Sequence, residues 1–255
     1  MTYNNFDELV STIKSVEAVE GIELVVVDGG QCQLTKDYLS QLSLGSLNFS
    51  FVSEPDEGIS DAFNKALRMS KGNAVVFINS GDRLIDKDYF ARCEQRFSTD
   101  PSIDFIHAAV GFEDRVAGPI VLKPSMSGLG AGMPYRHQSM VVKRKVFEEL
   151  GQFDPKLRLT MDYDFVCRMH LAGCKGFYDS TSAVVMMDGK GVSSTQELAA
   201  YREVSRLLTK YKLWNLSNLL GTVKRYLFYF VRRFLIFARL TSLLAVLKRL
   251  KHGAS

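Results

Sequence analysis

The chain has 255 residues, of which 46% are hydrophobic, and its 32 basic and 28 acidic residues leave a net charge of +4. This length and hydrophobic content suffice for a single α/β domain with a sizeable core and an appendage. The four cysteines form no Cys-x-x-Cys pair, so we expect free thiols and a reducing compartment rather than a disulfide framework. Four histidines argue against a conventional multi-histidine metal site.

The first predicted elements are a helix and a strand that ends in an aspartate. Apolar residues recur at helical spacing from Leu9 to Val16, after a helix start at Phe6. A β-branched run over residues 23–27 then predicts a strand, which stops at Asp28 and two glycines. Glycines at such a position let a ligand or another backbone approach closely.

The same pattern returns further along the chain. Residues 59–67 carry an apolar helical stripe, and the uninterrupted apolar run 74–78 predicts a strand covered on both faces, typical of a parallel sheet. Asp82 follows this strand. Ligands of open α/β sheets bind beyond the carboxyl ends of the strands, so we expect Asp28 and Asp82 to face one nucleotide crevice. No Gly-x-Gly-x-x-Gly turn follows a strand, which argues against a dehydrogenase.

The second half continues with alternating elements. Residues 139–142 predict a strand, and residues 143–150 and 194–212 predict helices. Another helix starts at Asp162, where an aspartate is commonly an N-cap worth about 1 kcal/mol. Residues 111–135 are rich in glycine and contain three prolines, so we expect a mobile loop there.

Four motifs in this order resemble the inverting, GT-A fold glycosyltransferases of family 2, especially those that assemble bacterial exopolysaccharide, colanic acid or O-antigen. The resemblance implies an α/β fold with a mostly parallel, Rossmann-like sheet flanked by helices. It spans most of the chain, because the motifs are Val26–Gly30, Ser53–Ile59 with Ala62 and Asn64–Lys65, Phe77–Asp82, and His137–Ser139 with Asp162–Asp164.

The resemblance implies a site for a nucleotide-diphosphate sugar donor. Asp28 matches the aspartate that hydrogen-bonds the nucleobase, and Tyr3 matches the aromatic residue beside it. The residues expected to face the nucleoside, sugar or diphosphate are Asp61, Asn64, Lys65, His137 and Gln138. Plainer roles stay open, because an aspartate suits any helix N-terminus, a lysine is usually solvated and an isolated histidine usually packs. The glycine-rich segment 189–194 resembles a loop that closes over donor phosphates, and it is equally compatible with a surface loop.

Two further roles concern the reaction itself. A divalent cation, Mg²⁺ or Mn²⁺, usually neutralises the leaving diphosphate, and the resemblance makes Asp82 its expected contact. The family's Asp-x-Asp element is Ser80-Gly81-Asp82 here, so a hydroxyl replaces the first carboxylate. An inverting transfer also needs a carboxylate to take the proton from the acceptor hydroxyl. Asp162 matches that catalytic base, with Asp164 as the second candidate.

The C-terminal region interleaves basic and apolar residues and has no acidic residue from 213 to 251. A helical wheel separates the two kinds, with Lys224, Arg225, Arg232 and Arg239 on one side and Leu227, Phe230, Phe234 and Phe237 on the other. The longest uncharged run, 240–247, is too short to span a bilayer. We therefore expect a helix that lies on an anionic membrane surface. A partner subunit is an alternative, and nucleic acid is disfavoured because the apolar residues form a broad stripe.

The N-terminus lacks a feature that the resemblance leads us to expect. Family members begin with a hydrophobic strand, whereas Met1 here directly precedes the polar stretch Thr2–Asn5, and no cleavable signal is visible. We expect the native protein to be longer by about 5 to 8 residues, one strand. Mass spectrometry of the native protein that found its N-terminus at Met1 or Thr2 would contradict this expectation.

These observations predict a catalytic domain over residues 1–212 and a membrane-associating tail over 213–255. The predicted activity is transfer of a sugar from a nucleotide-diphosphate donor to a glycan or lipid-linked acceptor, at the cytoplasmic face of the inner membrane and peripherally attached. A nucleotidyltransferase is the competing enzyme, and a catalytically inactive membrane-bound module that binds nucleotide sugars is the third possibility. The sequence does not distinguish the sugar, the linkage or the acceptor.

Overall fold

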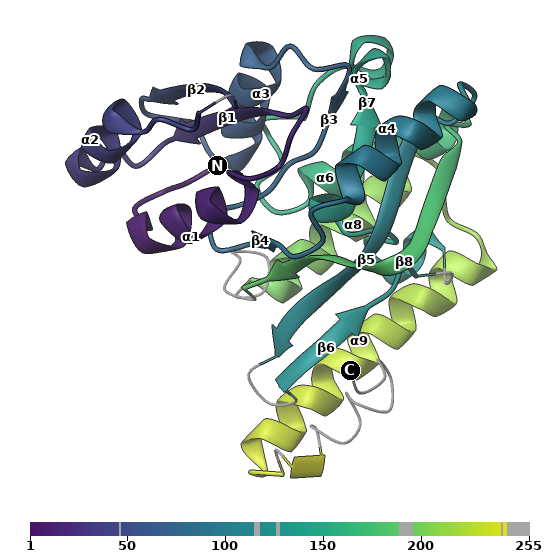
Figure 1. Cartoon of the computed structure of the whole chain (residues 1–255). Helices are drawn as coiled ribbons and strands as arrows, with labels where there is room; N and C mark the ends of the chain where they lie inside the picture. The colour runs from purple at the N-terminus through teal and green to yellow at the C-terminus, as the bar shows by residue number, and fades with distance from the viewer. Residues whose placement is uncertain (46, 115–117, 126–127, 189–195, 241, 244–255) are drawn as a thin grey trace.

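The computed structural model describes residues 1–243, apart from residues 46, 115–117, 126–127, 189–195 and 241. Its first part alternates helices and strands, as the sequence predicts: α1 (Phe6–Val16), β1 (Glu23–Asp28), α2 (Gln33–Gln41), β2 (Asn48–Ser53) and α3 (Ile59–Met69) (Figure 1). Strands β1 and β2 are parallel, with Asp28 in register with Ser53. Both strands therefore end at the same edge of the sheet.

A larger sheet follows, with strand order β3-β7-β5-β8-β4 and β6 paired to β5. Its strands are β3 (Ala74–Val75), β4 (Arg83–Leu84), β5 (Phe105–Asp114), β6 (Gly118–Leu122), β7 (Val141–Lys143) and β8 (Gly176–Met187). β5 and β8 are parallel, whereas β7, β6 and β4 run antiparallel to their neighbours. The sheet is mixed rather than mostly parallel, because only the first half follows the repeating strand–helix pattern.

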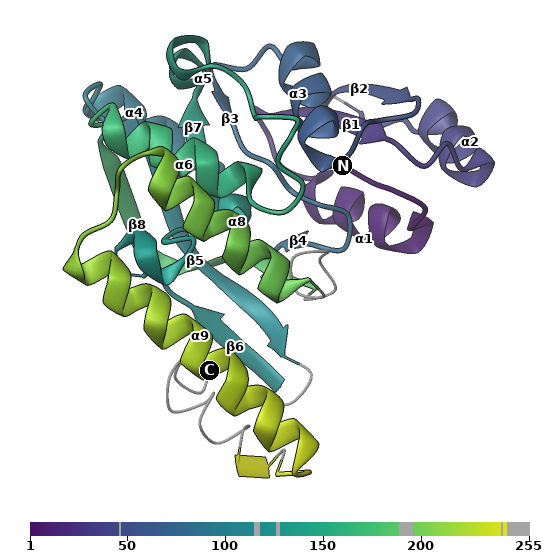
Figure 2. The ribbon, with the colours of Figure 1, turned by 180° about the vertical axis from the view of Figure 1, so that it is seen from behind.

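Helices cover the two faces of this larger sheet. Helix α4 (Tyr89–Thr99) lies on one face, and α6 (Met161–Leu171) and α8 (Glu197–Lys210) lie on the other (Figure 2). Successive side chains of β5 point to opposite faces of the sheet. Phe105 belongs to the core cluster under α6, and Ile106 belongs to the cluster under α4. Four rings, from Phe63 of α3 and from Phe77, Phe147 and Phe165, pack in the first cluster.

Met1 and Thr2 join the two sheets. The Thr2 N–H donates to the Val27 carbonyl at 2.9 Å, and Gly29 N–H donates to the Thr2 carbonyl at 3.1 Å. On the other side, Ser80 N–H donates to the Met1 carbonyl at 2.9 Å. The Met1–Thr2 segment thus connects the end of β1, at Asp28, with the turn that contains Ser80. The prediction of a further strand before Met1 stays untested.

One expectation from the sequence is wrong. The glycine- and proline-rich segment 111–135 contains the end of β5, the whole of β6 and the 3₁₀ turn η1 (Leu129–Ala131), rather than one continuous mobile loop. Gly111 lies in β5 where a Cβ would come 2.7 Å from Met186 Cε on β8. Glycine there permits close packing between neighbouring strands, and it does not indicate mobility.

The other predicted helices are found with small changes of boundary. Helix α5 spans Arg144–Leu150, a second 3₁₀ turn, η2, spans His137–Ser139, and the tail forms α9 (Leu216–Phe237). Helix α9 lies at the opposite end of the molecule from α2 (Figure 1). None of the described helices combines the length and apolar character that a bilayer span requires. All four cysteines are free thiols, as expected.

Candidate active site

Asp28 is wholly buried at the end of β1 and is held by two hydrogen bonds. Its Oδ1 accepts from the Gly30 N–H at 3.0 Å, and its Oδ2 accepts from the Ser53 hydroxyl at 2.6 Å. The loop after β2 closes over the same point, since a Cβ on Gly29 would lie only 1.7 Å from Asp56 Oδ2. Both carboxylate oxygens are thus engaged within the protein and no part of Asp28 is exposed, so its contact with a nucleobase stays a prediction.

Asp82 stands in a tight turn that α1 holds in place. Gly81 has φ 100°, a conformation open to glycine, and its N–H donates to the Thr12 hydroxyl at 2.9 Å. The same hydroxyl donates to the Asp82 carbonyl at 2.8 Å. Only 6% of Asp82 is exposed, and burial raises the pKa of its carboxyl, against the opposing effects of the Asp188 N–H, His137 and Gln138. The position of this carboxylate is thus fixed by a helix distant in sequence.

His137 joins Asp82 to the start of α6. Its Nδ1 lies 3.2 Å from Asp162 Oδ2, and its Nε2 lies 3.3 Å from the Asn79 amide nitrogen. The arrangement suits the tautomer in which Nε2 accepts from Asn79 and Nδ1–H donates to Asp162. Asp162 retains 21% of its side-chain exposure, so a ligand can reach the carboxylate that His137 orients. This series of hydrogen bonds from Asn79 through His137 to Asp162 brings together His137 and Asp162, two predicted site residues that are distant in sequence.

Asp164 has a different environment from Asp162. Its side chain is 2% exposed and forms ion pairs with Arg168 at 3.0 Å and Lys210 at 3.1 Å. It also accepts a hydrogen bond from the Tyr211 hydroxyl at 2.7 Å. These contacts tie α6 to the end of α8 and leave Asp164 enclosed. Of the two neighbouring aspartates, only Asp162 faces His137, and its catalytic role stays a prediction.

The predicted donor-binding residues of α3 already have partners within the protein. Asn64 is 7% exposed and uses both ends of its amide on the Phe153 backbone, at 2.9 and 3.0 Å. Lys65 forms ion pairs with Glu54 at 3.0 Å and with Asp61 at 3.2 Å. Asn64 therefore fastens the 151–157 segment to α3, whereas Asp61 and Lys65 form a network at the helix start.

Two other predicted donor contacts lie near the carboxylates. Tyr3 is 66% exposed beside the turn after β1, where a Cβ on Gly30 would meet Asn4. Gln138 is buried in η2, and its side chain lies beside the Asp82 carboxyl and opposes the rise in the pKa of that carboxyl. The predicted phosphate loop, 189–194, lies outside the residues that the structure describes.

The structure adds residues that the sequence interpretation missed. Arg136 is half-buried beside Asp162, and burial lowers the pKa of its guanidinium against the opposing charge of Asp162. Asp188 directly follows β8, and its N–H donates to Asp82 Oδ1 at 3.2 Å. A sequence signal for Asp188 existed, because it follows the apolar run 183–187 in the way that Asp28 and Asp82 follow their strands. Arg136 is adjacent to the His137 motif.

The residues around Asp82 fit a cation that shares its coordination with substrate. Asp82 Oδ2 and Ser80 Oγ are buried and have no hydrogen-bond partner among the described residues. A buried polar atom without a partner is costly, unless a ligand completes it. In the described part of the chain, no group of three or more His, Cys, Asp or Glu residues is placed to hold a metal alone. Mg²⁺ commonly takes one or two carboxylates and completes its shell with waters and substrate phosphates.

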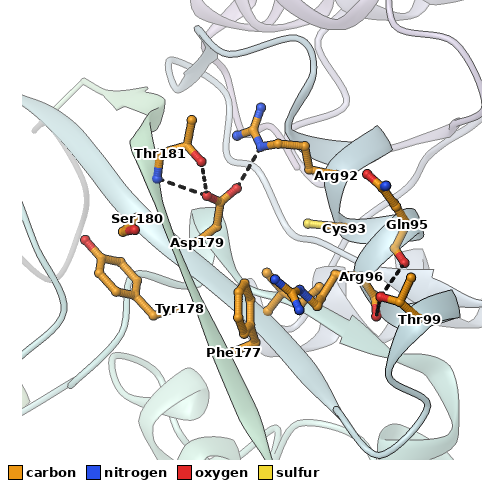
Figure 3. A pocket seen from close by; sticks show the side chains of 11 residues that line it. Arg92, Cys93, Gln95, Arg96, Thr99, Phe177, Tyr178, Asp179, Ser180 and Thr181 are labelled. Carbon is orange, nitrogen blue, oxygen red and sulfur yellow. Dashed lines mark hydrogen bonds and ion pairs between the residues drawn. The ribbon is translucent and has the colours of Figure 1, made fainter.

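A groove lies between α4 and β8, away from these aspartates (Figure 3). It has a volume of about 620 Å³, and Arg92, Arg96 and Asp179 are among its lining residues. Arg92 is paired with Asp179 at 2.9 Å and with Asp86 at 2.8 Å, and Arg96 stacks on Phe177. None of the predicted donor or catalytic residues lines this groove. The candidate active site is therefore the region of Asp28, Asp82 and Asp162 rather than this groove.

Solved structures identify the fold. The chain is similar to the mannosyltransferase PcManGT from Pyrobaculum calidifontis, solved with GDP-Man and Mn²⁺, with a TM-score of 0.65, 15% identity and coverage of 100% of this chain and 74% of that chain. It is also similar to residues 1–349 of S. aureus TarS in complex with UDP-GlcNAc, with a TM-score of 0.64, 15% identity and coverage of 88% and 69%. The fold is that of the GT-A glycosyltransferases.

Sequence comparison then identifies the family. The model of glycosyl transferase family 2 matches residues 1–151, more than half of the chain, so the protein belongs to this family. An uncharacterized glycosyltransferase of Mycobacterium tuberculosis is 29% identical over 180 residues, 67% of each chain. A PGL/p-HBAD biosynthesis glycosyltransferase of Mycobacterium bovis is 22% identical over 157 residues, 57% of each chain.

Proposed function

We propose that this glycosyltransferase moves a sugar from a nucleotide-diphosphate donor to a glycan or lipid-linked acceptor in bacterial surface polysaccharide synthesis, with inversion at the anomeric carbon. The observation that carries the proposal is the chain Asn79–His137–Asp162, which holds an accessible carboxylate next to the turn of Asp82. The nucleotide sugars bound by PcManGT and TarS, GDP-Man and UDP-GlcNAc, support a nucleotide-sugar donor.

The arrangement suggests a division of the chemistry among the aspartates. Asp28 accepts a hydrogen bond from the nucleobase, and Asp82 would hold a divalent cation, which would supply positive charge to the diphosphate. Asp162 takes the proton from the acceptor hydroxyl while the acceptor oxygen forms its bond to the anomeric carbon. The bond from that carbon to the diphosphate oxygen breaks on the opposite face, and its electron pair leaves with the diphosphate. His137 orients the base, and Arg136 adds positive charge beside it.

Asp162→Asn tests the base, with Asp164→Asn as its matched control two residues away. We expect Asp162→Asn to lower kcat by about 10²- to 10⁴-fold, the usual contribution of a general base, without a change in the free energy of unfolding. Asp164→Asn should instead destabilise the fold by about 1 to 3 kcal/mol, because it removes the charge of a buried carboxylate that Arg168, Lys210 and the Tyr211 hydroxyl contact. Equal activity of Asp162→Asn and wild type, in folded protein, would refute the assignment.

The products distinguish the alternative functions. Transfer of a sugar releases a nucleoside diphosphate, whereas a nucleotidyltransferase releases pyrophosphate. A catalytically inactive module would bind a nucleotide sugar and release neither product. Proton NMR of the first product formed reports the anomeric configuration, and retention would contradict the inverting mechanism. A thermal-shift screen of nucleotide sugars with Mg²⁺ or Mn²⁺ would identify the donor to use, because a bound ligand raises the apparent stability.

We further propose that α9 attaches the protein to the cytoplasmic membrane surface. The faces of this helix are arranged in an unexpected way. Arg232 pairs with Glu197 of α8, and the Arg225 guanidinium lies 4.7 Å from the centre of the Tyr201 ring, so two arginines of the predicted membrane-facing side point into the protein. Nine large apolar side chains, 42 to 88% exposed, occupy about a third of the helix circumference on the outer side: Leu216, Leu219, Leu220, Val223, Leu227, Phe230, Val231, Phe234 and Phe237.

The edges of this outer face carry the remaining positive charge. Lys224 and Arg233 are exposed and flank the apolar residues on the helix wheel. An apolar stripe with basic edges suits insertion into the boundary between headgroups and acyl chains of an anionic bilayer. A patch of this kind is rare on a monomer in water. A lipid-linked acceptor would then be presented at the surface to which the enzyme is attached.

Vesicle co-sedimentation tests the membrane proposal. We expect wild type to bind phosphatidylcholine vesicles that contain phosphatidylglycerol more strongly than pure phosphatidylcholine vesicles. Phe230→Gln with Phe234→Gln should remove this binding, whereas Leu171→Gln, at an exposed leucine of α6, should not. Equal sedimentation of the double variant and wild type would exclude the outer face of α9 as the attachment surface. A self-associating protein would instead show a change in oligomeric state in the double variant without any lipid.

A further inference from the structure

Asp188 lies against the turn that contains Asp82. A Cβ built on Gly81 would come 3.0 Å from Asp188 Oδ2 and 3.2 Å from Asp188 Cβ. The Asp188 N–H donates to Asp82 Oδ1 at 3.2 Å, so backbone and side chain of Asp188 both contact the turn. The side chain therefore covers the middle residue of Ser80-Gly81-Asp82. It reaches this position from the end of β8, 106 residues further along the chain.

The chemistry of this cluster calls for a cation. Asp82 Oδ2 is buried and has no partner among the described residues, and Ser80 Oγ on the other side of Gly81 is in the same condition. Two carboxylates at this place would repel the diphosphate of a donor sugar, since all three groups are negative. A divalent cation removes the conflict, because it binds carboxylate oxygen and phosphate oxygen at once.

We propose that Asp188 is the second carboxylate of the cation site, in place of the carboxylate that Ser80 lacks. The inference rests on the proposed glycosyl transfer and deepens it by naming a residue for the cation. Asp82 would hold the ion from the end of the turn and Asp188 from beside Gly81, and Ser80 would contribute at most a neutral hydroxyl. Gly81 has two reasons to be glycine, its φ of 100° and the approach of Asp188.

Mn²⁺ binding measured by electron paramagnetic resonance provides the test, since free Mn²⁺ gives a signal that is lost on binding. MnCl₂ is titrated into the full chain in the presence of saturating UDP or GDP, whichever the wild type binds. We expect Asp188→Asn to weaken Mn²⁺ binding by about tenfold or more, the usual effect of a change near a metal. Glu148→Gln, an exposed carboxylate of α5, is the charge-matched control and should leave binding unchanged. Ser80→Asp in the Asp188→Asn background should restore most of the affinity.

Each outcome decides the proposal. Unchanged Mn²⁺ affinity in folded Asp188→Asn overturns it, even if the wild type transfers sugar. Sugar transfer by the wild type with no Mn²⁺ binding in the presence of nucleotide also overturns it and leaves the proposed function standing. If the wild type binds nucleotide and Mn²⁺ normally but transfers no sugar, the proposed function fails and the cation site is supported by the Asp188→Asn loss. Should Asp188→Asn not fold, Asp188→Ser takes its place, because a serine at this position also removes the carboxylate.

Discussion

His107 is a buried histidine of β5, in the sheet that pairs β5 with β8. It is 7% exposed and packs among three rings, with ring centres 4.4 Å away for Tyr135, 5.3 Å for Tyr178 and 5.8 Å for Phe105. Its Nδ1 is buried without a partner among the described residues. Burial lowers the pKa of His107 to about 4 from an ordinary 6.5, because the charged ring would lose its hydration.

The lowered pKa makes the stability depend on pH in a defined direction. Between pH 6.5 and pH 4 the unfolded chain binds a proton at His107 and the folded chain does not, so acid favours unfolding. The contribution of neutral His107 is complete above pH 6.5 and is lost as the pH falls toward 4. The difference of about 2.5 pKa units, at about 1.36 kcal/mol per unit, gives a total loss of about 3 kcal/mol. At pH 5 the loss is about 2 kcal/mol.

Urea unfolding at pH 7.5 and pH 5.0 measures this effect in wild type and in His107→Phe, which keeps an aromatic ring in the stack. Carboxylates titrate alike in both proteins, so the difference between them isolates His107. We expect the free energy of unfolding of wild type to fall by about 2 kcal/mol more than that of His107→Phe over this interval. His170→Gln, which removes an exposed histidine of α6, should behave as wild type. Parallel losses in wild type and His107→Phe, within about 0.5 kcal/mol, would refute the reasoning.

Two other substitutions test how the site is supported. Ser53→Ala removes the 2.6 Å hydrogen bond to Asp28, and we expect weaker nucleotide binding by about tenfold, from a charged hydrogen bond worth about 1.5 kcal/mol, with kcat little changed at saturating donor. Isothermal titration with the nucleotide measures it, and an unchanged Kd would show that Ser53 does not position Asp28. Gly130→Ala places a Cβ 2.1 Å from the Asn218 carbonyl oxygen, so α9 must shift. We expect a protease to cleave peptide bonds of α9 faster in Gly130→Ala than in wild type. Equal cleavage rates in the two proteins would contradict the close packing of Gly130 against α9.

The sequence predicted the positions of the aspartates better than their separate roles. Asp28 and Asp82 were expected at strand ends on one crevice; Asp28 does end β1, whereas the strand predicted over 74–78 is only β3 (Ala74–Val75) and Asp82 lies in the turn before β4. Asp162 and Asp164 have the same chemistry, and an i,i+2 pair lies about 200° apart on a helix, so only one of them can face the site. The sequence does not tell which. The partners of Asp164 come from α8, which is distant in sequence and invisible to local pattern.

Glycines gave the least reliable signal in this chain. A glycine marks either a free turn or a close contact, and the two cannot be distinguished before the neighbour is known. Gly81 combines a turn conformation with a close contact to Asp188. Gly111 makes room for Met186, and Gly130 makes room for the α9 backbone. The predicted loop at 111–135 failed for this reason. The mixed sheet was also beyond the sequence, because β4 and β3 are two-residue strands whose pairing depends on β8 and β7.

The tail shows what helical periodicity can and cannot decide. The wheel correctly separated basic from apolar residues in α9, and it could not say which side faces the protein. The arginine side is turned inward because α8 offers partners for it, Glu197 for Arg232 and the ring of Tyr201 for Arg225. The ion pair with Glu197 offsets the desolvation of Arg232, whereas Nε and Nη2 of Arg225 are buried without a hydrogen-bond partner among the described residues. Once the arginines face α8, the apolar side can only face outward, and this exposed apolar face is what the membrane proposal explains.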